Sequence, residues 1–243
     1  MDGPFANRIA VVTGASRGIG RATAIALAQG GAHVVAIART QGGLEALDDD
    51  IQAAGGTATL VPLDLTDYPG IDRLGAAIHE RWQKLDILVG NAGILGKLSP
   101  LGHIAPKLWD DVMSVNVTAN WRLIRSLDPL LRNSNAGRAV FVTSGAASKC
   151  LAYWGPYSVS KAALDALVRT YAAETETTLA KVNLFSPGPT RTRLRAETMP
   201  GEDPLTLPTP EAVASQLVSL CLPDFDDTGS TYRFVEGGPK KIS

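Results

Sequence analysis

Short apolar runs rich in valine, isoleucine and threonine alternate with amphipathic stretches along almost the whole sequence. Such runs predict strands at residues 8–14, 33–38, 58–64, 85–90, 138–144, 181–186 and 231–236. Helical spacing of apolar positions marks residues 20–29 and 44–54, and further helical stretches separate the later strands. This alternation is typical of parallel pairing with right-handed crossovers, which places helices on both faces of one sheet. We therefore predict one α/β domain over residues 1–243, built on a doubly wound parallel sheet of about seven strands.

The pattern is interrupted once, near the C-terminus. Residues 197–210 carry four prolines and no regular apolar spacing. The stretch is too short to link two domains, so we interpret residues 190–210 as a substrate loop or lid.

Composition and charge exclude several classes of function. Of the 243 residues, 45% are hydrophobic and 19% are charged, which is ordinary for a globular protein, and the formal net charge is −1. With no long basic run, we expect neither nucleic-acid nor membrane-surface binding. The apolar run at the start is too short for a signal peptide or a membrane span. Two cysteines and three scattered histidines predict neither a disulfide framework nor a metal site, so we expect a cytoplasmic protein.

The sequence YWGPYSVSK, residues 153–161, places a tyrosine and a lysine four positions apart. Pro156 is suited to the first turn of a helix, and in that helix Tyr157 and Lys161 lie on one face. A nearby ammonium favours the phenolate, so we expect the pKa of Tyr157 to fall below about 10. The alternative is an exposed pair without chemistry.

The sequence TGASRGIG, residues 13–20, connects the first predicted strand to the first predicted helix. Gly14, Gly18 and Gly20 allow the backbone to turn tightly and approach a pyrophosphate, while the helix start offers unpaired N–H groups. The position indicates a nucleotide-binding turn.

Two arginines indicate which nicotinamide cofactor this turn would hold. An NAD enzyme needs a carboxylate after the second strand, yet residues 21–44 contain no Asp or Glu. Arg39 stands there instead, and Arg17 lies in the glycine turn, so a 2′-phosphate would find two guanidinium groups. We therefore predict NADP(H); the alternative is that both arginines are merely solvated.

Further motifs occur in the order known from one enzyme family. They are LDLTD at 63–67, GNAG at 90–93, VNVT at 115–118, VTSGAAS at 142–148, SPGPTRT at 186–192 and VEGG at 235–238. With these motifs, the chain from Arg8 to Gly238 resembles the classical short-chain dehydrogenases/reductases. It departs at Gly90, where the family has asparagine, and at the sequence TSG, where paired serines are more usual. Neither departure removes a residue aligned with the catalytic ones.

The resemblance implies a Rossmann-like fold and an NADP(H)-dependent oxidoreductase that interconverts a carbonyl and a secondary alcohol. It implies that Tyr157 is the general acid and base, that Lys161 favours its phenolate and binds the nicotinamide ribose, and that Ser144 binds the substrate oxygen. Asn116 would anchor a water in a proton relay. Asp64 and Leu65 would contact the adenine. The full set of cofactor contacts that the resemblance implies is Gly14, Ser16, Arg17, Gly18, Ile19, Gly20, Arg39, Asp64, Leu65, Asn91, Ala92, Gly93, Tyr157, Lys161, Pro187, Gly188, Thr190 and Thr192.

The substrate is less well defined by the sequence. Tyr153 and Trp154 precede the predicted tyrosine and favour an apolar or flat substrate, and Cys150 nearby is interpreted as a small buried hydrophobe. The lid residues Arg191, Arg193 and Arg195 either clamp an acidic substrate or form a solvated face.

Assembly and two rival functions also remain open. Family resemblance suggests a homodimer or homotetramer, packed through the long helices around Trp121 and Leu164. One rival is a cofactor-binding sensor without turnover; the other is an epimerase or dehydratase, which shares the Tyr-x-x-x-Lys spacing.

Overall fold

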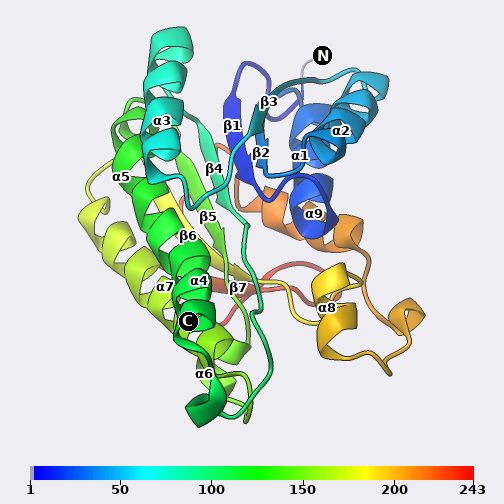
Figure 1. Cartoon of the computed structure of the whole chain (residues 1–243). Coiled ribbons are helices and arrows are strands. Elements are labelled where there is room, and N and C mark those ends of the chain that lie inside the picture. The colour runs from blue at the N-terminus through cyan, green and yellow to red at the C-terminus, as the bar shows by residue number, and fades with distance from the viewer. Residues whose placement is uncertain (1–2) are drawn as a thin grey trace.

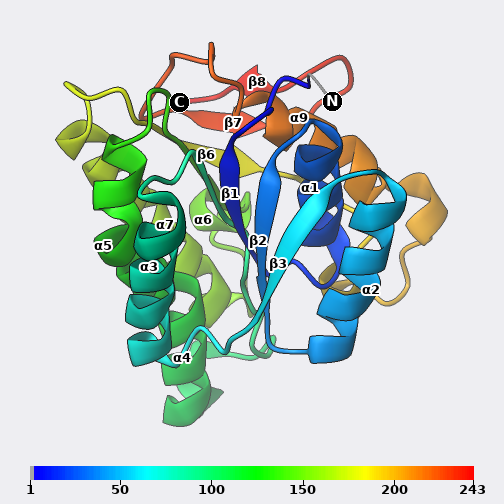
Figure 2. The ribbon, with the colours of Figure 1, turned by 90° about the horizontal axis from the view of Figure 1, so that it is seen from above.

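The computed structural model describes residues 3–243 and has one twisted sheet between two layers of helices (Figure 1, Figure 2). In these residues the sheet has eight strands in the order β3-β2-β1-β4-β5-β6-β7-β8. All neighbours are parallel except β7 and β8, which are antiparallel. The strands are β1 (Ile9–Thr13), β2 (His33–Ala38), β3 (Thr57–Pro62), β4 (Ile87–Gly90), β5 (Arg138–Val142), β6 (Lys181–Ser186), β7 (Thr231–Arg233) and β8 (Lys240–Lys241).

Helices follow the strands as right-handed crossovers require. They are α1 (Gly18–Gln29), α2 (Gln41–Ala53), α3 (Tyr68–Trp82), α4 (Pro106–Met113), α5 (Ala119–Arg132), α6 (Ala146–Lys149), α7 (Gly155–Glu174), α8 (Arg193–Thr198) and α9 (Pro210–Ser219). Short 3₁₀ turns lie at Leu101–His103 and Pro204–Thr206, and a π-helical turn at Ser114–Thr118 joins α4 to α5. Helices α3, α5 and α7 cover one face of the sheet, and α1, α2 and α9 cover the other (Figure 2). Among the residues described, no helix combines the length and apolar character that a membrane crossing requires.

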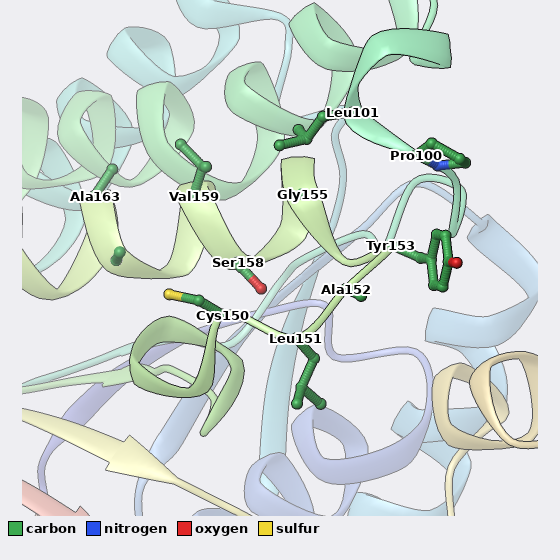
Figure 3. A pocket seen from close by; sticks show the side chains of 11 residues that line it. Pro100, Leu101, Cys150, Leu151, Ala152, Tyr153, Gly155, Ser158, Val159 and Ala163 are labelled. Carbon is green, nitrogen blue, oxygen red and sulfur yellow. The ribbon is translucent and has the colours of Figure 1, made fainter.

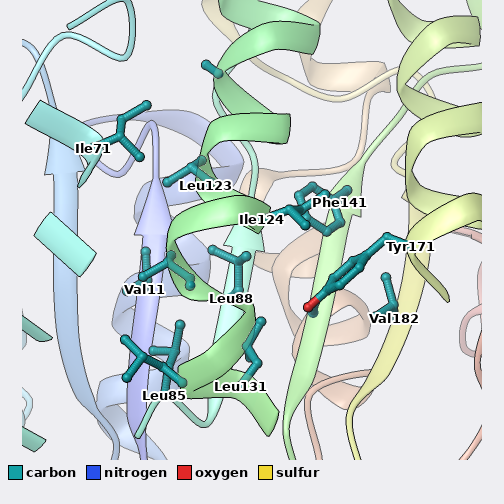
Figure 4. Packing of buried hydrophobic residues seen from close by; sticks show 14 of the residues in the cluster. Val11, Ile71, Leu85, Leu88, Leu123, Ile124, Leu131, Phe141, Tyr171 and Val182 are labelled. Carbon is teal, nitrogen blue, oxygen red and sulfur yellow. The ribbon is translucent and has the colours of Figure 1, made fainter. Parts of the chain in front are cut away.

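Two hydrophobic clusters, one on each face of the sheet, hold these layers together. On the face covered by α3, α5 and α7, Leu123, Phe141 and Tyr171 pack with side chains from β1 and β4 (Figure 4). On the other face, Leu27, Leu47 and Leu217 come from α1, α2 and α9. Burying a side chain of this size stabilises a fold by about 1.5–3 kcal/mol. The central strands β1, β2, β4, β5 and β6 are buried almost throughout, whereas β3, β7 and β8 towards the edges are partly or fully exposed.

The topology places the candidate site. The strand order reverses direction between β1 and β4, and in open parallel sheets ligands bind at such a point, beyond the carboxyl ends of the strands. The glycine turn follows β1, residues 91–93 follow β4, and Ser144 follows β5. These segments therefore meet at one edge of the sheet.

The predicted single-domain α/β fold is confirmed, with differences at its margins. Strand β8 was not predicted, because two lysines carry no apolar pattern. Residues 193–198, within the proposed lid, form a helix rather than irregular loop. Helix α9 begins at Pro210, where the proposed lid ends. Subunit packing through the long helices around Trp121 and Leu164 stays a prediction. Within the chain the Leu164 side chain is fully buried in the core, whereas Trp121 is 44% exposed.

Candidate active site

The glycine turn forms a cradle that only glycine permits. Gly14 and Gly18 have φ of 66° and 57°, in the left-handed region where a side chain is strained. A Cβ at Gly20 would lie 2.4 Å from both the Gly14 carbonyl oxygen and Asn91 Nδ2. The cradle opens onto the first turn of α1, whose N–H groups suit a phosphate. The residues present therefore fit the pyrophosphate of a dinucleotide.

The end of β4 holds this cradle in shape. The Asn91 side chain donates to the Thr13 carbonyl at 2.9 Å. The main-chain N–H groups of Asn91 and Ala92 donate to the Thr13 hydroxyl at 3.0 and 3.1 Å. Thr13 thus joins two predicted cofactor segments, although it is not itself among the predicted site residues.

Arg17 and Arg39 are both exposed beside the glycine cradle. A Cβ at Gly43, in the first turn of α2, would meet Ser16 Cβ at 2.9 Å and Thr40 Oγ1 at 3.0 Å, so the segment after Arg39 packs against the cradle. Guanidinium groups placed this way can bind a 2′-phosphate with charge-assisted hydrogen bonds.

Asp64 and Leu65 follow β3 on the same side. The main-chain N–H of Thr66 lowers the pKa of Asp64, and the charge of Arg39 lowers it further. Leu65 is buried in the core, so its main chain rather than its side chain is left to face a ligand. Asp64 is exposed.

Tyr157 and Lys161 share one face of α7, as predicted, and both are buried. Lys161 Nζ lies 5.8 Å from the centroid of the Tyr157 ring and donates to the Val142 carbonyl at 2.7 Å. Ser144, just beyond the end of β5, lies near enough to the Tyr157 hydroxyl to lower the pKa of Tyr157. A Cβ at Gly93 would lie 3.5 Å from Lys161 Nζ, so the segment after β4 also reaches this point.

The prediction that the pKa of Tyr157 falls was wrong. Burial raises the pKa of Tyr157, and the nearby Ser144 side chain offsets only part of that rise. Burial also lowers the pKa of Lys161 to about 8, although the charge of Asp165 raises it. For Tyr157, desolvation by the surrounding fold therefore decides the direction of the shift. Tyr157 is kept protonated, which suits a proton donor.

Asn116 lies in the π-helical turn and is fully buried. Its side chain exchanges two hydrogen bonds with the main chain of Ile94, at 2.8 and 2.9 Å, and donates to Ser160 Oγ at 2.9 Å. π-turns inside helices are frequent at functional sites. Here the turn ties the segment after β4 to α7, beside Lys161.

The loop after β6 closes the site from above. Gly188 has φ of 67°, and Thr190 is buried with its hydroxyl directed at the Pro187 and Gly188 carbonyls. Thr192 caps α8, and its methyl group lies 3.5 Å from the position of a Cβ at Gly18. The start of the lid thus lies over the glycine cradle.

Contacts within the lid oppose the idea of an acid-binding clamp. Arg191 donates to the carbonyls of residues 204, 205 and 207. Arg193 pairs with Glu197 at 2.8 Å, and Arg195 pairs with Glu202 at 2.6 Å. The three guanidinium groups hold the lid together.

A cavity of about 690 Å³ lies on a different face of α7 (Figure 3). It is lined by Pro100, Leu101, Cys150, Leu151, Ala152, Tyr153, Gly155, Ser158, Val159, Ala162 and Ala163. Among the described residues that line this cavity, none is a predicted catalytic residue. Tyr153 therefore faces this cavity, whereas Trp154 packs beside Tyr157 with ring centroids 6.0 Å apart. Cys150 is exposed, so its interpretation as a buried hydrophobe was wrong.

The departure from the family motif at Gly90 has a local explanation. A Cβ there would lie 2.3 Å from Phe141 Cδ1 and 2.8 Å from Asn120 Oδ1. The ring of Phe141 on β5 occupies the space in which a side chain at residue 90 would lie. Packing is therefore complete without the asparagine.

Comparisons with known proteins support this arrangement of segments. The short chain dehydrogenase profile matches residues 8–203. The "Uncharacterized oxidoreductase YciK" of Escherichia coli K12 is 37% identical over 207 residues, which cover 84% of this chain and 82% of that protein. A short chain dehydrogenase from Shigella flexneri 2a, solved with NADP, superposes with a TM-score of 0.89 at 34% identity, covering 96% and 99% of the two chains. One from Escherichia coli CFT073, solved with NADPH, gives 0.87 at 34% identity, covering 96% and 98%.

Proposed function

Because the chain belongs to the short-chain dehydrogenase family, we propose that it is an NADP(H)-dependent oxidoreductase that interconverts a carbonyl and a secondary alcohol. The observation that supports this best is the meeting of Tyr157, Lys161 and Ser144 at the sheet edge that also carries the glycine cradle. NADP and NADPH in two similar structures, together with Arg17 and Arg39, support the choice of phosphorylated cofactor.

Four side chains would perform the chemistry that the protein itself must supply. When bound, the nicotinamide cofactor supplies or accepts the hydride. Ser144 donates a hydrogen bond to the substrate oxygen and holds it beside Tyr157. Tyr157 then gives its phenolic proton to that oxygen in reduction and takes it back in oxidation. A positioned acid of this kind contributes roughly 10²–10⁴ in rate.

Lys161 and Asn116 act behind the tyrosine. The ammonium of Lys161 stabilises the phenolate that remains after proton transfer and offers donors to the ribose of the cofactor. Asn116 fixes the backbone of the segment after β4 and would hold a relay water near Lys161. The remaining cofactor contacts are proposed as the sequence predicts them. A cytoplasmic location and assembly into a homodimer or homotetramer likewise stay predictions.

A screen of aldehydes and ketones with NADPH tests this function. We expect loss of the reduced cofactor's absorbance with at least one apolar carbonyl compound, and a slower rate with NADH. Tight NADPH binding without turnover of any compound would favour the sensor, and product formation without net change in the cofactor would favour an epimerase or dehydratase.

A further inference from the structure

One turn beyond Lys161, α7 carries a carboxylate that the mechanism above does not use. Asp165 is half-buried, and residues four apart on a helix are neighbours. The Thr143 hydroxyl donates to Asp165 Oδ1. An ionised carboxylate can only accept hydrogen bonds, so this contact suits the charged form of Asp165.

The end of β5 is thereby attached to α7 at two successive turns. Lys161 Nζ donates to the Val142 carbonyl at 2.7 Å, and the next residue, Thr143, donates to Asp165. Thr143 is itself buried, and it directly precedes Ser144. Any shift of Thr143 would therefore move the hydroxyl that contacts Tyr157.

We propose that Asp165 is a positioning residue whose carboxylate keeps the Lys161 ammonium charged and holds Thr143, and with it Ser144, against α7. The role of Asp165 in catalysis rests on the proposed function, whereas the effect of Asp165 on the charge of Lys161 does not.

The groups that face Lys161 support this assignment. Burial lowers the pKa of Lys161 to about 8, and Asp165 is the charge that raises it. Among residues 3–243, the other groups close to the ammonium are uncharged: the Tyr157 phenol, the Val142 carbonyl and the Asn116 amide near Gly93. Burial raises the pKa of Asp165 itself, while Thr143, Arg169 and Lys161 lower it. Without the carboxylate, Lys161 would lose its proton closer to neutral pH.

Nuclear magnetic resonance of cofactor-free protein labelled at lysine Cε tests the electrostatic part without any turnover. The Lys161 signal is assigned by its loss in Lys161→Gln. We expect a Lys161 pKa of about 8 in the wild type and a fall of about one pH unit in Asp165→Asn, a modest shift because the two side chains, one helical turn apart, form no direct salt bridge. Thr143→Val is the matched control, because it removes the hydrogen bond and keeps the charge, and there the Lys161 pKa should change little.

The functional part is tested by NADPH affinity and reductase rate as functions of pH. In Asp165→Asn the alkaline limb of both profiles should move to lower pH by the same amount as the Lys161 pKa, and Asp165→Glu should restore it. Thr143→Val should lower the rate without moving the limb. If Asp165→Asn fails to fold, Asp165→Ser supplies the uncharged variant. An unchanged Lys161 pKa in the uncharged variant would overturn the inference. If the wild type reduces no carbonyl, the proposed function fails while the resonance measurement still decides the role of Asp165.

Discussion

Lys161→Met should make the cofactor-free protein more stable at neutral pH, although the lysine lies at the centre of the proposed site. Its side chain is 3% exposed, and burial lowers its pKa from 10.5 to about 8. At 1.36 kcal/mol per pH unit, keeping the buried ammonium charged costs about 3 kcal/mol. Methionine removes that cost but loses the charge-assisted hydrogen bond to the Val142 carbonyl, which contributes about 1.5–3 kcal/mol. The net gain should be about 1 kcal/mol.

The pH dependence identifies the cause of this gain. The pKa of Lys161 is lower in the folded than in the unfolded protein, so the cost is fully present below about pH 8 and is lost as pH rises through 10.5. The advantage of the methionine variant should therefore shrink over this interval and reverse above it.

Urea unfolding of wild type and variant at several pH values between 7 and about 11 measures the difference. Lys97→Met, at an exposed position, is the control and should follow the wild type. A Lys161→Met protein that is less stable than the wild type at pH 7, by an amount independent of pH, would refute the reasoning.

Three further predictions concern the cofactor cradle and the lid. Arg39→Asp should shift the cofactor preference towards NAD(H) by more than tenfold, because charge-assisted hydrogen bonds contribute about 1.5–3 kcal/mol. If fluorescence titration gave the wild type equal affinity for NADPH and NADH, the assignment of Arg39 to the 2′-phosphate would be excluded. Gly20→Ala should weaken NADPH binding at least tenfold, measured by calorimetry, and destabilise the protein by about 1–3 kcal/mol through overpacking, measured by unfolding. Gly42→Ala is the control, because no atom lies within 4 Å of its added Cβ, and it should change neither quantity. Glu202→Gln should speed proteolytic cleavage of the lid several-fold by breaking the ion pair between Glu202 and Arg195. Because the hydrogen bond from Arg195 lowers the pKa of Glu202, the wild type should become equally susceptible only as pH falls below the ordinary glutamate range. An unchanged cleavage pattern would contradict the lid structure.

The strands could be predicted where apolar runs have sharp polar boundaries. Residues 33–38 and 181–186 coincide with β2 and β6 as predicted, because both strands are buried and end at polar turns. The last predicted strand, 231–236, is shorter in the structure, ending at Arg233, and its partner at Lys240–Lys241 left no trace in the sequence. A short antiparallel edge depends on pairing rather than on local pattern.

The glycine cradle and the Tyr157–Lys161 pair could be predicted because both depend on local spacing. The contact between Thr143 and Asp165 joins residues 22 apart, and the filling of the space at Gly90 by Phe141 joins residues 51 apart, so neither has a local signal. The predicted direction of the Tyr157 pKa shift was wrong for the same reason. Desolvation depends on how the whole fold covers the side chain, and spacing along one helix does not reveal it.

Tyr157→Phe tests the central claim most directly, because it keeps the ring and its packing while removing the only proton that the residue can give. The comparison should use a carbonyl compound that the wild type reduces with NADPH. We expect nearly unchanged stability and NADPH affinity, with a rate lowered by roughly 10² or more. A Tyr157→Phe protein that keeps most of its reductase activity would contradict the account.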